Sequence, residues 1–221
     1  MSDETVVYLA RHGATDLNLQ VPIRLQGNQI DSPLAAVGVE QATALGEALR
    51  GVRVDAVYSS VMLRARHTSQ IVAAPHGLTP TAVEGLQEVS VGKWEALSWS
   101  EIQARYPVEF KAFFDNPAEV PYLGGECYID VLARARPVFN KLVAQHAGQG
   151  IVIVTHNVVN RVLVADCLGL ALDRAKFLHQ SNCCFNEIRC RPGGITDVFS
   201  MNNDRHVWPW TKLKSSLGPG I

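Results

Sequence analysis

Short apolar runs rich in β-branched residues alternate along this chain with longer segments of helical periodicity. The runs Val6–Ala10, Val54–Tyr58 and Ile151–Val154 are predicted strands. Apolar residues recur at helical spacing within Leu34–Leu49 and Glu126–Gln145, which are predicted helices. Strands that alternate with helices favour a mostly parallel sheet with helices on both faces. We therefore expect an α/β fold, a three-layer sandwich around one central sheet.

Weaker local signals complete this pattern. Ser60 is the predicted N-cap of a helix after the second strand. Pro107 is expected to break a helical segment, and Pro137 to kink or interrupt the long helix. Two further strands, 184–189 and 195–200, are expected around a Pro-Gly-Gly turn.

Length and composition limit both the architecture and the partners of the chain. With 221 residues, a single domain spanning 1–221 is favoured, with an insertion or lid at about 90–125. The formal net charge of -1 argues against a nucleic-acid partner. No stretch approaches about 20 apolar residues, so no membrane association is expected. The five cysteines include no C-x-x-C pair, which favours reduced thiols and a cytoplasmic location.

Two histidines follow the two strongest predicted strands. Arg11 and His12 come directly after the first strand, and His156 follows the strand that ends near residue 154. Ligands bind at the carboxyl ends of the strands in such sheets, so both imidazoles are expected to face one crevice. Arg64 lies on the first turn of a helix, although an exposed helix face is the alternative because Arg66 is close by. Two arginines, two histidines and a carboxylate suit phosphoryl transfer.

Five short motifs follow one another in a fixed order along the chain. They are RHGATDLN from residue 11, SVMLRARHT from residue 60, LQEVSVGKWE from residue 86, GGE from residue 124 and VTH from residue 154. This order resembles the histidine phosphatase superfamily, also called phosphoglycerate mutase-like. The resemblance covers the chain from about residue 6 to 156 and implies the fold of that family.

The resemblance implies that His12 is the nucleophile and becomes transiently phosphorylated. A neutral imidazole is a competent nucleophile near pH 7. Glu88 would protonate the leaving oxygen and later activate water, because a carboxyl in a partly dry site can hold a proton. Glu84 and Glu95 are rivals for this role, and Glu95 is otherwise expected on the surface or in closing the loop.

The resemblance also implies a set of phosphate-binding residues. Arg11, Arg64 and His156 would hold the phosphoryl oxygens and complete the catalytic set with His12 and Glu88. Further substrate contacts are expected from Asn18, Gln26, Gly27 and Asn157. Neither a metal ion nor a cofactor is expected, and the predicted partner is a small phosphomonoester.

These features predict a metal-independent, acid-type phosphatase of the phosphatase branch, acting on a sugar phosphate or a phosphoglycerate-like metabolite. A phosphoglycerate mutase is the first alternative. The mutases have a different motif after the acid and an Arg-rich insertion, whereas Ser100–Pro117 contains only Arg105 and Lys111 as cations. A non-enzymatic phosphate-binding protein is the alternative from another class, and a homodimer is an expectation from the family.

Two other chemistries have partial support in the sequence. Cys183 and Arg189 match the C-x-x-x-x-x-R pattern of cysteine phosphatases, but the residues between them contain no glycine and are typical of a strand. A metal hydrolase could use His12, His156 and Glu88 with a residue such as Asp16. No H-x-H or H-x-x-x-H pair is present to begin such a site, and two arginines aimed at it would repel the ion.

Overall fold

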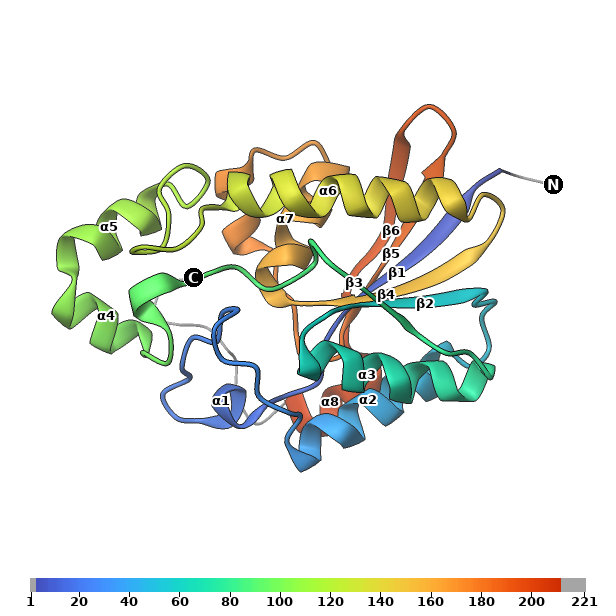
Figure 1. Ribbon diagram of the computed structural model, residues 1–221, viewed down its shortest axis with the longest axis horizontal. Coiled ribbons are helices and arrows are strands. Elements are labelled where there is room, and N and C mark those ends of the chain that lie inside the picture. Colours follow the sequence, from blue (N-terminus) through green and yellow to red (C-terminus); the bar gives the residue numbers. More distant parts are fainter. Residues whose placement is uncertain (1–2, 212–221) are drawn as a thin grey trace.

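The computed structural model describes residues 3–211, which contain one six-stranded sheet with the order β3-β2-β4-β1-β5-β6. The strands are β1 (Thr5–Arg11), β2 (Ala56–Ser60), β3 (Thr81–Val83), β4 (Gly150–Thr155), β5 (Phe185–Arg191) and β6 (Ile195–Asn203). Strands β1 to β4 are parallel to one another, whereas β5 runs antiparallel to both β1 and β6. The prediction of a mostly parallel sheet is confirmed, and the antiparallel part is a hairpin at one edge (Figure 1).

Strand β4 lies inside the sheet, and all six of its residues are buried. A continuous apolar run is typical of a parallel strand that is covered on both faces. Side chains alternate between the two faces, so Ile151 and Ile153 join one hydrophobic core while Val152 and Val154 join the other. The sheet therefore separates two apolar layers, each of which needs a cover of helices.

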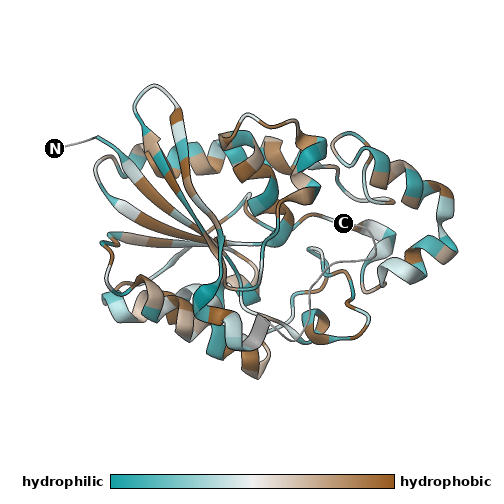
Figure 2. Ribbon diagram, turned by 180° about the vertical axis from the view of Figure 1, so that it is seen from behind, coloured by the Kyte–Doolittle hydropathy of each residue, from teal (hydrophilic) through white to brown (hydrophobic). Residues whose placement is uncertain are grey.

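Helices lie on both faces of the sheet, with α2 and α3 on one side and α6 and α7 on the other (Figure 1). The α-helices of the described chain are α1 (Asp16–Leu19), α2 (Ala36–Leu49), α3 (Leu63–Ala73), α4 (Trp99–Arg105), α5 (Pro107–Asp115), α6 (Tyr128–Gln145), α7 (Asn157–Cys167) and α8 (Trp208–Thr211). Short 3₁₀ segments are η1 (Ala74–His76), η2 (Gly92–Trp94), η3 (Leu172–Phe177) and η4 (Arg205–Val207). Figure 2 shows apolar residues concentrated on the strands and polar residues on many outward parts of the helices. The predicted three-layer α/β fold is confirmed.

No helix within residues 3–211 combines the length and the apolar character that crossing a membrane would require.

The predicted N-cap at Ser60 is wrong. Ser60 is the last residue of β2, and α3 begins at Leu63 after the N-cap Met62. The Leu63 N–H donates to the carboxylate of Asp31 at 2.8 Å. The carboxylate of Asp31, from a distant loop, therefore accepts the hydrogen bond at the N-terminus of α3. The sequence had predicted the hydroxyl of Ser60 as the acceptor.

The predicted interruption at Pro137 is absent, because α6 continues through this residue from Tyr128 to Gln145. Proline removes one backbone N–H and leaves the carbonyl four residues earlier, at Ala133, without its helical partner. Both Pro137 and Ala133 are exposed, so water can hydrate that carbonyl. The helix therefore tolerates proline on its solvent side.

Residues 90–125 include the two short helices α4 and α5, which project beyond the end of the sheet (Figure 1). Pro107 is the first residue of α5, so the predicted break between the two helices is confirmed. Trp94 is fully buried at the base of this lobe, and its ring lies edge-on to the rings of Trp99, Phe113 and Tyr122. Aromatic packing therefore holds the lobe against the main core.

Two glycines allow the loop after β1 to approach the start of α2. A Cβ atom on Gly13 would lie 2.4 Å from the carbonyl oxygen of Gly38, and one on Gly38 would lie 2.1 Å from the carbonyl oxygen of Ala14. The Ala35 N–H donates to the same Ala14 oxygen at 2.9 Å. This contact fixes the backbone that follows β1, where His12 lies.

Gly38→Ala is expected to lower the free energy of unfolding by about 1–3 kcal/mol, because the added methyl group overlaps backbone atoms of another segment. Gly51→Ala is the matched control, since a Cβ atom there has nothing within 4 Å, and its effect should stay within about 0.5 kcal/mol. Urea titrations of both variants measure the difference. Equal effects of the two substitutions would contradict a packing role for Gly38.

Candidate active site

Parallel pairing of β1 with β4 brings the two histidines together. Arg11 lies opposite Thr155 in the register, and the His12 N–H donates to the Thr155 carbonyl at 3.0 Å. The ring centroids of His12 and His156 are 5.1 Å apart, with 58° between the ring planes. His12 is 3% exposed and His156 is fully buried. The expected convergence of both imidazoles at the carboxyl ends of these strands is therefore observed.

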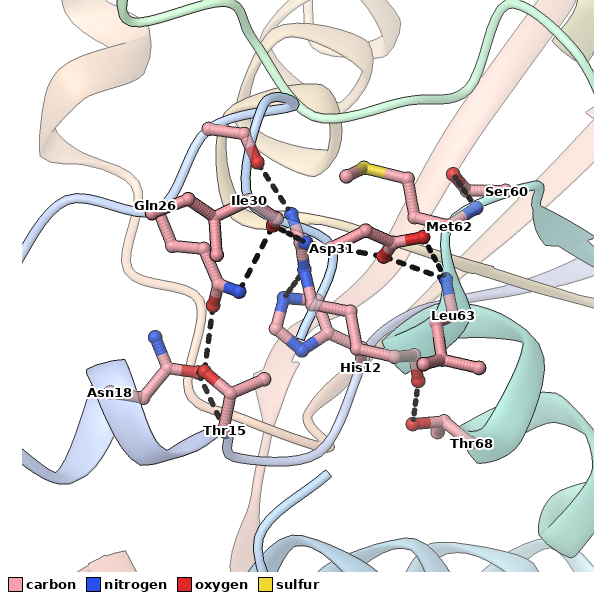
Figure 3. A network of polar contacts seen from close by, with 12 residues as sticks. His12, Thr15, Asn18, Gln26, Ile30, Asp31, Ser60, Met62, Leu63 and Thr68 are labelled. Atoms are coloured by element: carbon pink, nitrogen blue, oxygen red, sulfur yellow. Dashed lines mark hydrogen bonds and ion pairs between the residues drawn. The ribbon is translucent and has the colours of Figure 1, made fainter. Parts of the chain in front are cut away.

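The surroundings of His12 define its tautomer and its charge. Nδ1 lies 2.7 Å from the carbonyl oxygen of Gly13, and because a carbonyl can only accept, Nδ1 carries the proton. Nε2 is then the acceptor, and it receives a hydrogen bond from Arg64 Nε at 3.3 Å (Figure 3). Burial, followed by the positive charges of Arg64 and Arg11, holds the pKa of His12 well below its usual range. At neutral pH, Nε2 thus carries a lone pair, which is the form required of a nucleophile.

Arg64 is fully buried at the start of α3, so the alternative that it lies on an exposed helix face is wrong. Arg66 is the arginine that lies on the exposed face of this helix. Its guanidinium donates to backbone carbonyls, from Nη1 to Ile30 at 3.1 Å and from Nη2 to Gly27 at 2.9 Å. The carboxylate of Asp31 lies 3.9 Å from Nη1 and is half-exposed. Because carbonyls orient a guanidinium without cancelling its charge, most of the positive charge remains available to an anion.

Arg11 and His156 contribute further polar atoms without partners. Arg11 Nη1 donates to the carbonyl of Gln180 at 2.6 Å, while its buried Nε has no hydrogen-bond partner among residues 3–211. Burial lowers the pKa of Arg11 to about 10, so the group stays charged at neutral pH. Both ring nitrogens of His156 are also buried and unpartnered within the described chain. Burial, together with the charge of Arg64, lowers the pKa of His156 well below its ordinary value.

The carboxylate of Glu88 lies at the N-terminus of α7. It accepts hydrogen bonds from the N–H groups of Val89 at 2.9 Å, Asn157 at 2.9 Å and Val158 at 3.2 Å. Helix N-termini favour negative charge, so α7 orients and stabilises this group. Glu88 is only 4% exposed, and it lines the same cavity as His12.

The two rival carboxylates lie outside this cavity. Glu84 is exposed and accepts a hydrogen bond from the side chain of Gln87. Glu95 accepts from the N–H of Gly27 at 2.8 Å, and burial raises its pKa. Glu95 therefore closes the loop that carries the carbonyl partners of Arg64.

The predicted substrate-binding residues divide into two groups. Asn18, Gln26 and Asn157 line the cavity together with Arg11, whereas Gly27 and Arg64 do not. The N–H of Gly27 is bonded to Glu95 and its carbonyl to Arg64, so this residue supports the guanidinium. Direct substrate contact by Gly27 stays a prediction.

The three cavity residues differ in what they can offer a ligand. The amide oxygen of Asn18 accepts from the Thr15 N–H at 3.1 Å, which leaves its NH₂ group available to the cavity (Figure 3). Gln26 is bonded at both ends, to the Thr15 hydroxyl at 2.6 Å and to the Ile30 carbonyl at 3.3 Å. Asn157 Oδ1 is buried and has no partner in the described chain.

The cavity that these residues line has a volume of about 150 Å³. It includes polar side chains that the sequence analysis did not select, among them Arg24, Tyr128, Arg161 and Lys176. Arg161 follows Asn157 by four positions on α7, so the two side chains lie on one face of this helix. This helical spacing is the feature of the sequence that could have identified Arg161 as a cavity residue. Neither Arg105 nor Lys111, the cations noted in the insertion, lines the cavity.

A buried amide network behind the two histidines was also missed. The Asn160 amide donates to Gln180 at 3.2 Å, and Gln180 in turn donates to Asn186 at 2.9 Å. Asn186 donates to the Leu9 carbonyl of β1 at 2.9 Å. Because the Gln180 carbonyl receives the Arg11 guanidinium, the network ties that cation to three elements. Single-sequence patterns give no signal for such contacts between distant amides.

The alternative chemistries find little support in this geometry. Cys183 is fully buried, and burial holds the pKa of its thiol well above the ordinary value, so it is not a thiolate nucleophile near neutral pH. The residues after it form β5 rather than a phosphate-binding loop. Within residues 3–211, no group of three or more His, Cys, Asp or Glu side chains is arranged to hold a metal ion.

Comparison with known proteins identifies the family. The sequence matches the histidine phosphatase superfamily (branch 1) over residues 7–204. It is 35% identical over 167 residues to the metal-independent phosphoserine phosphatase of Arabidopsis thaliana, covering 73% of this chain and 68% of that protein. It is 31% identical over 172 residues to the glucosyl-3-phosphoglycerate phosphatase of Mycolicibacterium vanbaalenii, covering 75% of each chain.

Solved structures give the same result. Bacillus stearothermophilus YhfR superposes with a TM-score of 0.82 at 33% identity, covering 91% of this chain and 98% of that one. A mycobacterial glucosyl-3-phosphoglycerate phosphatase superposes with a TM-score of 0.81 at 27% identity, covering 90% and 99%. The fold and the matches therefore define an α/β phosphatase. The chain belongs to the histidine phosphatase superfamily, as its motifs predicted.

The lowered pKa of His156 predicts a specific dependence of stability on pH. Below about pH 6.5 the unfolded chain binds a proton at this residue that the folded chain does not, so stability falls as the pH falls. The slope is up to about 1.4 kcal/mol per pH unit. His156→Gln should remove this contribution, so the free energies of unfolding of variant and wild type should converge or cross on acidification.

Urea titrations between pH 7.5 and 5.5 test this expectation. His179→Gln is the matched control, because it replaces an exposed histidine with the same residue. Parallel curves for His156→Gln and the wild type would show that His156 is not held neutral in the folded protein.

Proposed function

We propose that this protein hydrolyses a small phosphomonoester through a phosphohistidine formed on His12. The observation that carries the proposal is the geometry of His12, whose Nε2 accepts a hydrogen bond from the buried guanidinium of Arg64, while the Asp31 carboxylate beside that guanidinium is half-exposed and 3.9 Å away. A phosphate dianion would supply the missing negative charge. In this arrangement the cations neutralise the oxygens while the lone pair approaches phosphorus.

The reaction then proceeds in two displacements. In the first, Glu88 begins in its protonated form; a bond forms between His12 Nε2 and phosphorus, the bond from phosphorus to the ester oxygen breaks, and Glu88 donates its proton to that oxygen. In the second, Glu88 takes a proton from water, the water oxygen bonds to phosphorus, and the bond to Nε2 breaks. Arg11, Arg64 and His156 hold the three transferred oxygens, with a further hydrogen bond from the NH₂ group of Asn18.

The size of the cavity supports a small substrate. A volume of about 150 Å³ lies below the range of about 300–1,000 Å³ usual for drug-sized ligands. Phosphoserine and glucosyl-3-phosphoglycerate, the compounds for which two relatives are named, are small metabolites. The lobe at residues 90–125 is the proposed lid, and its Trp99, Phe113 and Tyr122 form part of the wall around the non-phosphate portion.

Glu88→Gln is expected to reduce kcat for an alkyl phosphate by about 10²–10⁴-fold, because the alkoxide leaving group then departs without a proton. The loss in single-turnover cleavage of p-nitrophenyl phosphate should be smaller, since nitrophenolate leaves readily without one. Glu84→Gln is the matched control, because Glu84 is exposed outside the cavity. His12→Ala should abolish release of phosphate from both esters.

The assays are run with a chelator present, and acid-labile ³²P on the protein is followed after rapid mixing with labelled ester. Label that appears on the wild type and is absent from His12→Ala supports the intermediate. Equal losses for both esters in Glu88→Gln would argue against a role in leaving-group protonation. Phosphate release that survives in His12→Ala would refute the proposed nucleophile.

A further inference from the structure

The segment that carries Glu88 has no regular structure of its own. Residues 84–91 follow β3 and form neither helix nor strand. The side chains of Leu86 and Val89 are buried in the core, but apolar burial is non-directional and does not orient a backbone. The polar groups of this loop need partners from other elements, so those hydrogen bonds decide where Glu88 lies.

Arg134, on α6, provides most of these hydrogen bonds. Its Nη1 donates to the carbonyls of Gly85 at 3.0 Å and Gln87 at 2.7 Å, and its Nη2 donates to the carbonyl of Glu88 at 3.1 Å. The same guanidinium donates to both carboxylate oxygens of Glu126, from Nε at 2.8 Å and from Nη2 at 3.0 Å. All five N–H groups of the guanidinium are therefore used, and three of them hold the main chain of the acid and its neighbours.

Glu126 completes the connection on the other side of Glu88. Its carboxylate accepts from the Ser90 N–H at 2.8 Å, and its own N–H donates to the Ser90 carbonyl at 2.9 Å. A Cβ atom on Gly125 would lie 2.0 Å from that carbonyl oxygen, so the glycine permits the close approach. Arg134 and Glu126, which we call the Arg134–Glu126 clamp, thus hold the loop both before and after the acid.

The clamp holds the main chain of Glu88, whereas α7 holds its carboxylate. The hydrogen bonds from the N–H groups of Asn157 and Val158 to the ionised carboxylate are charge-assisted, so they weaken when the carboxyl takes up a proton. The first displacement of the proposed reaction requires that protonated form. The bonds from Arg134 end on backbone carbonyls, and they are therefore present in both protonation states.

We propose that Arg134, together with Glu126, is a positioning residue for proton transfer by Glu88. The inference rests on the proposed phosphatase function and adds the contact that keeps the acid within reach of the leaving oxygen. Arg134 does not line the cavity, so it acts through Glu88 and not on the substrate. Proton transfer needs a heavy-atom separation of about 2.6–3.2 Å, and a misplacement of about 1 Å can cost about 100-fold in rate.

Single-turnover cleavage by Arg134→Gln, Arg136→Gln and the wild type tests this role. The substrates are p-nitrophenyl phosphate and whichever of phosphoserine, 3-phosphoglycerate and glycerol 3-phosphate the wild type cleaves fastest. Arg136 is the matched control, because it is an exposed arginine of the same helix that also pairs with one carboxylate, that of Asp166. Arg136→Gln should stay within about twofold of the wild type for both esters.

Arg134→Gln should slow cleavage of the alkyl phosphate by about 10- to 100-fold. Its effect on p-nitrophenyl phosphate should be less than about threefold, because nitrophenolate leaves without a proton. Losses of equal size for the two esters, or losses no larger than those of Arg136→Gln, would overturn the inference.

The same substitutions are then combined with Glu88→Gln. Without an acid at position 88 there is no proton transfer to misplace, so Arg134→Gln should slow cleavage of the alkyl phosphate by less than about threefold in that background. A role confined to overall packing would instead lower the rate equally in both backgrounds, and the proposal would be wrong.

Failure of the proposed function has different signatures. If Glu88→Gln alone slows both esters equally, the acid assigned to the reaction is rejected, and the inference with it. If the wild type cleaves no ester, p-nitrophenyl phosphate included, the phosphatase function itself is rejected. In either case the result is visible before Arg134 is replaced.

Arg134→Lys replaces Arg134→Gln if that variant does not fold. Lysine retains the positive charge next to Glu126, but its three donors share one nitrogen and cannot span the carboxylate and three carbonyls. The loss should again be selective for the alkyl phosphate, at about 3- to 30-fold. Cleavage at the wild-type rate in whichever variant folds would show that Glu88 is positioned without the clamp, which would contradict the proposal.

Discussion

The parallel register between β1 and β4 is the constraint on which the whole site depends. It places Arg11 opposite Thr155, and the hydrogen bond from His12 N–H to the Thr155 carbonyl continues the pairing one residue further. Two loops that begin at adjacent strand ends cannot move independently, so the distance between the imidazoles is set by the sheet. The close approach of Gly13 to α2 then fixes the direction in which the first loop leaves. The frame of the active site is therefore the buried centre of the sheet.

The electrostatic design of the site follows from how the guanidiniums are held. Carbonyls from the Gly27–Ile30 loop position Arg64, and the carbonyl of Gln180 positions Arg11. Carboxylates in these places would have cancelled the charges and occupied the donors that an oxyanion needs. The same positive potential keeps His12 neutral, so one arrangement both attracts a phosphate and preserves the nucleophile. Glu88 is stabilised separately by backbone N–H groups of α7, which allows it to remain close to the cations without pairing with them.

Most of the fold could be predicted because its central strands have strong local signals. β4 is a continuous apolar run, and the segments on either side of Pro107 form separate helices as the sequence indicated. The errors arose where the deciding factor was not visible in the local pattern. At the start of α3, Asp31 accepts the hydrogen bond that was expected to go to Ser60. In α6, solvent exposure of Pro137 allows the helix to continue through this residue. For the site, motifs selected the side chains around His12, but the amides of Asn160, Gln180 and Asn186 have no signature in a single sequence.

The same reasoning explains why the part of the cavity beyond the phosphate pocket was harder to anticipate. The sequence analysis considered the cations of the insertion, Arg105 and Lys111, only as evidence against a mutase, and both residues lie outside the cavity. The insertion instead provides aromatic walls, and Arg161 comes from α7, the helix whose N-terminus also holds Glu88. One helix thus holds the acid of the proposed reaction at its N-terminus and contributes side chains to the wall of the cavity. A shift of α7 relative to β4 would therefore change catalysis and specificity together, whereas changes in the lid could alter the shape of the pocket without disturbing the reacting groups.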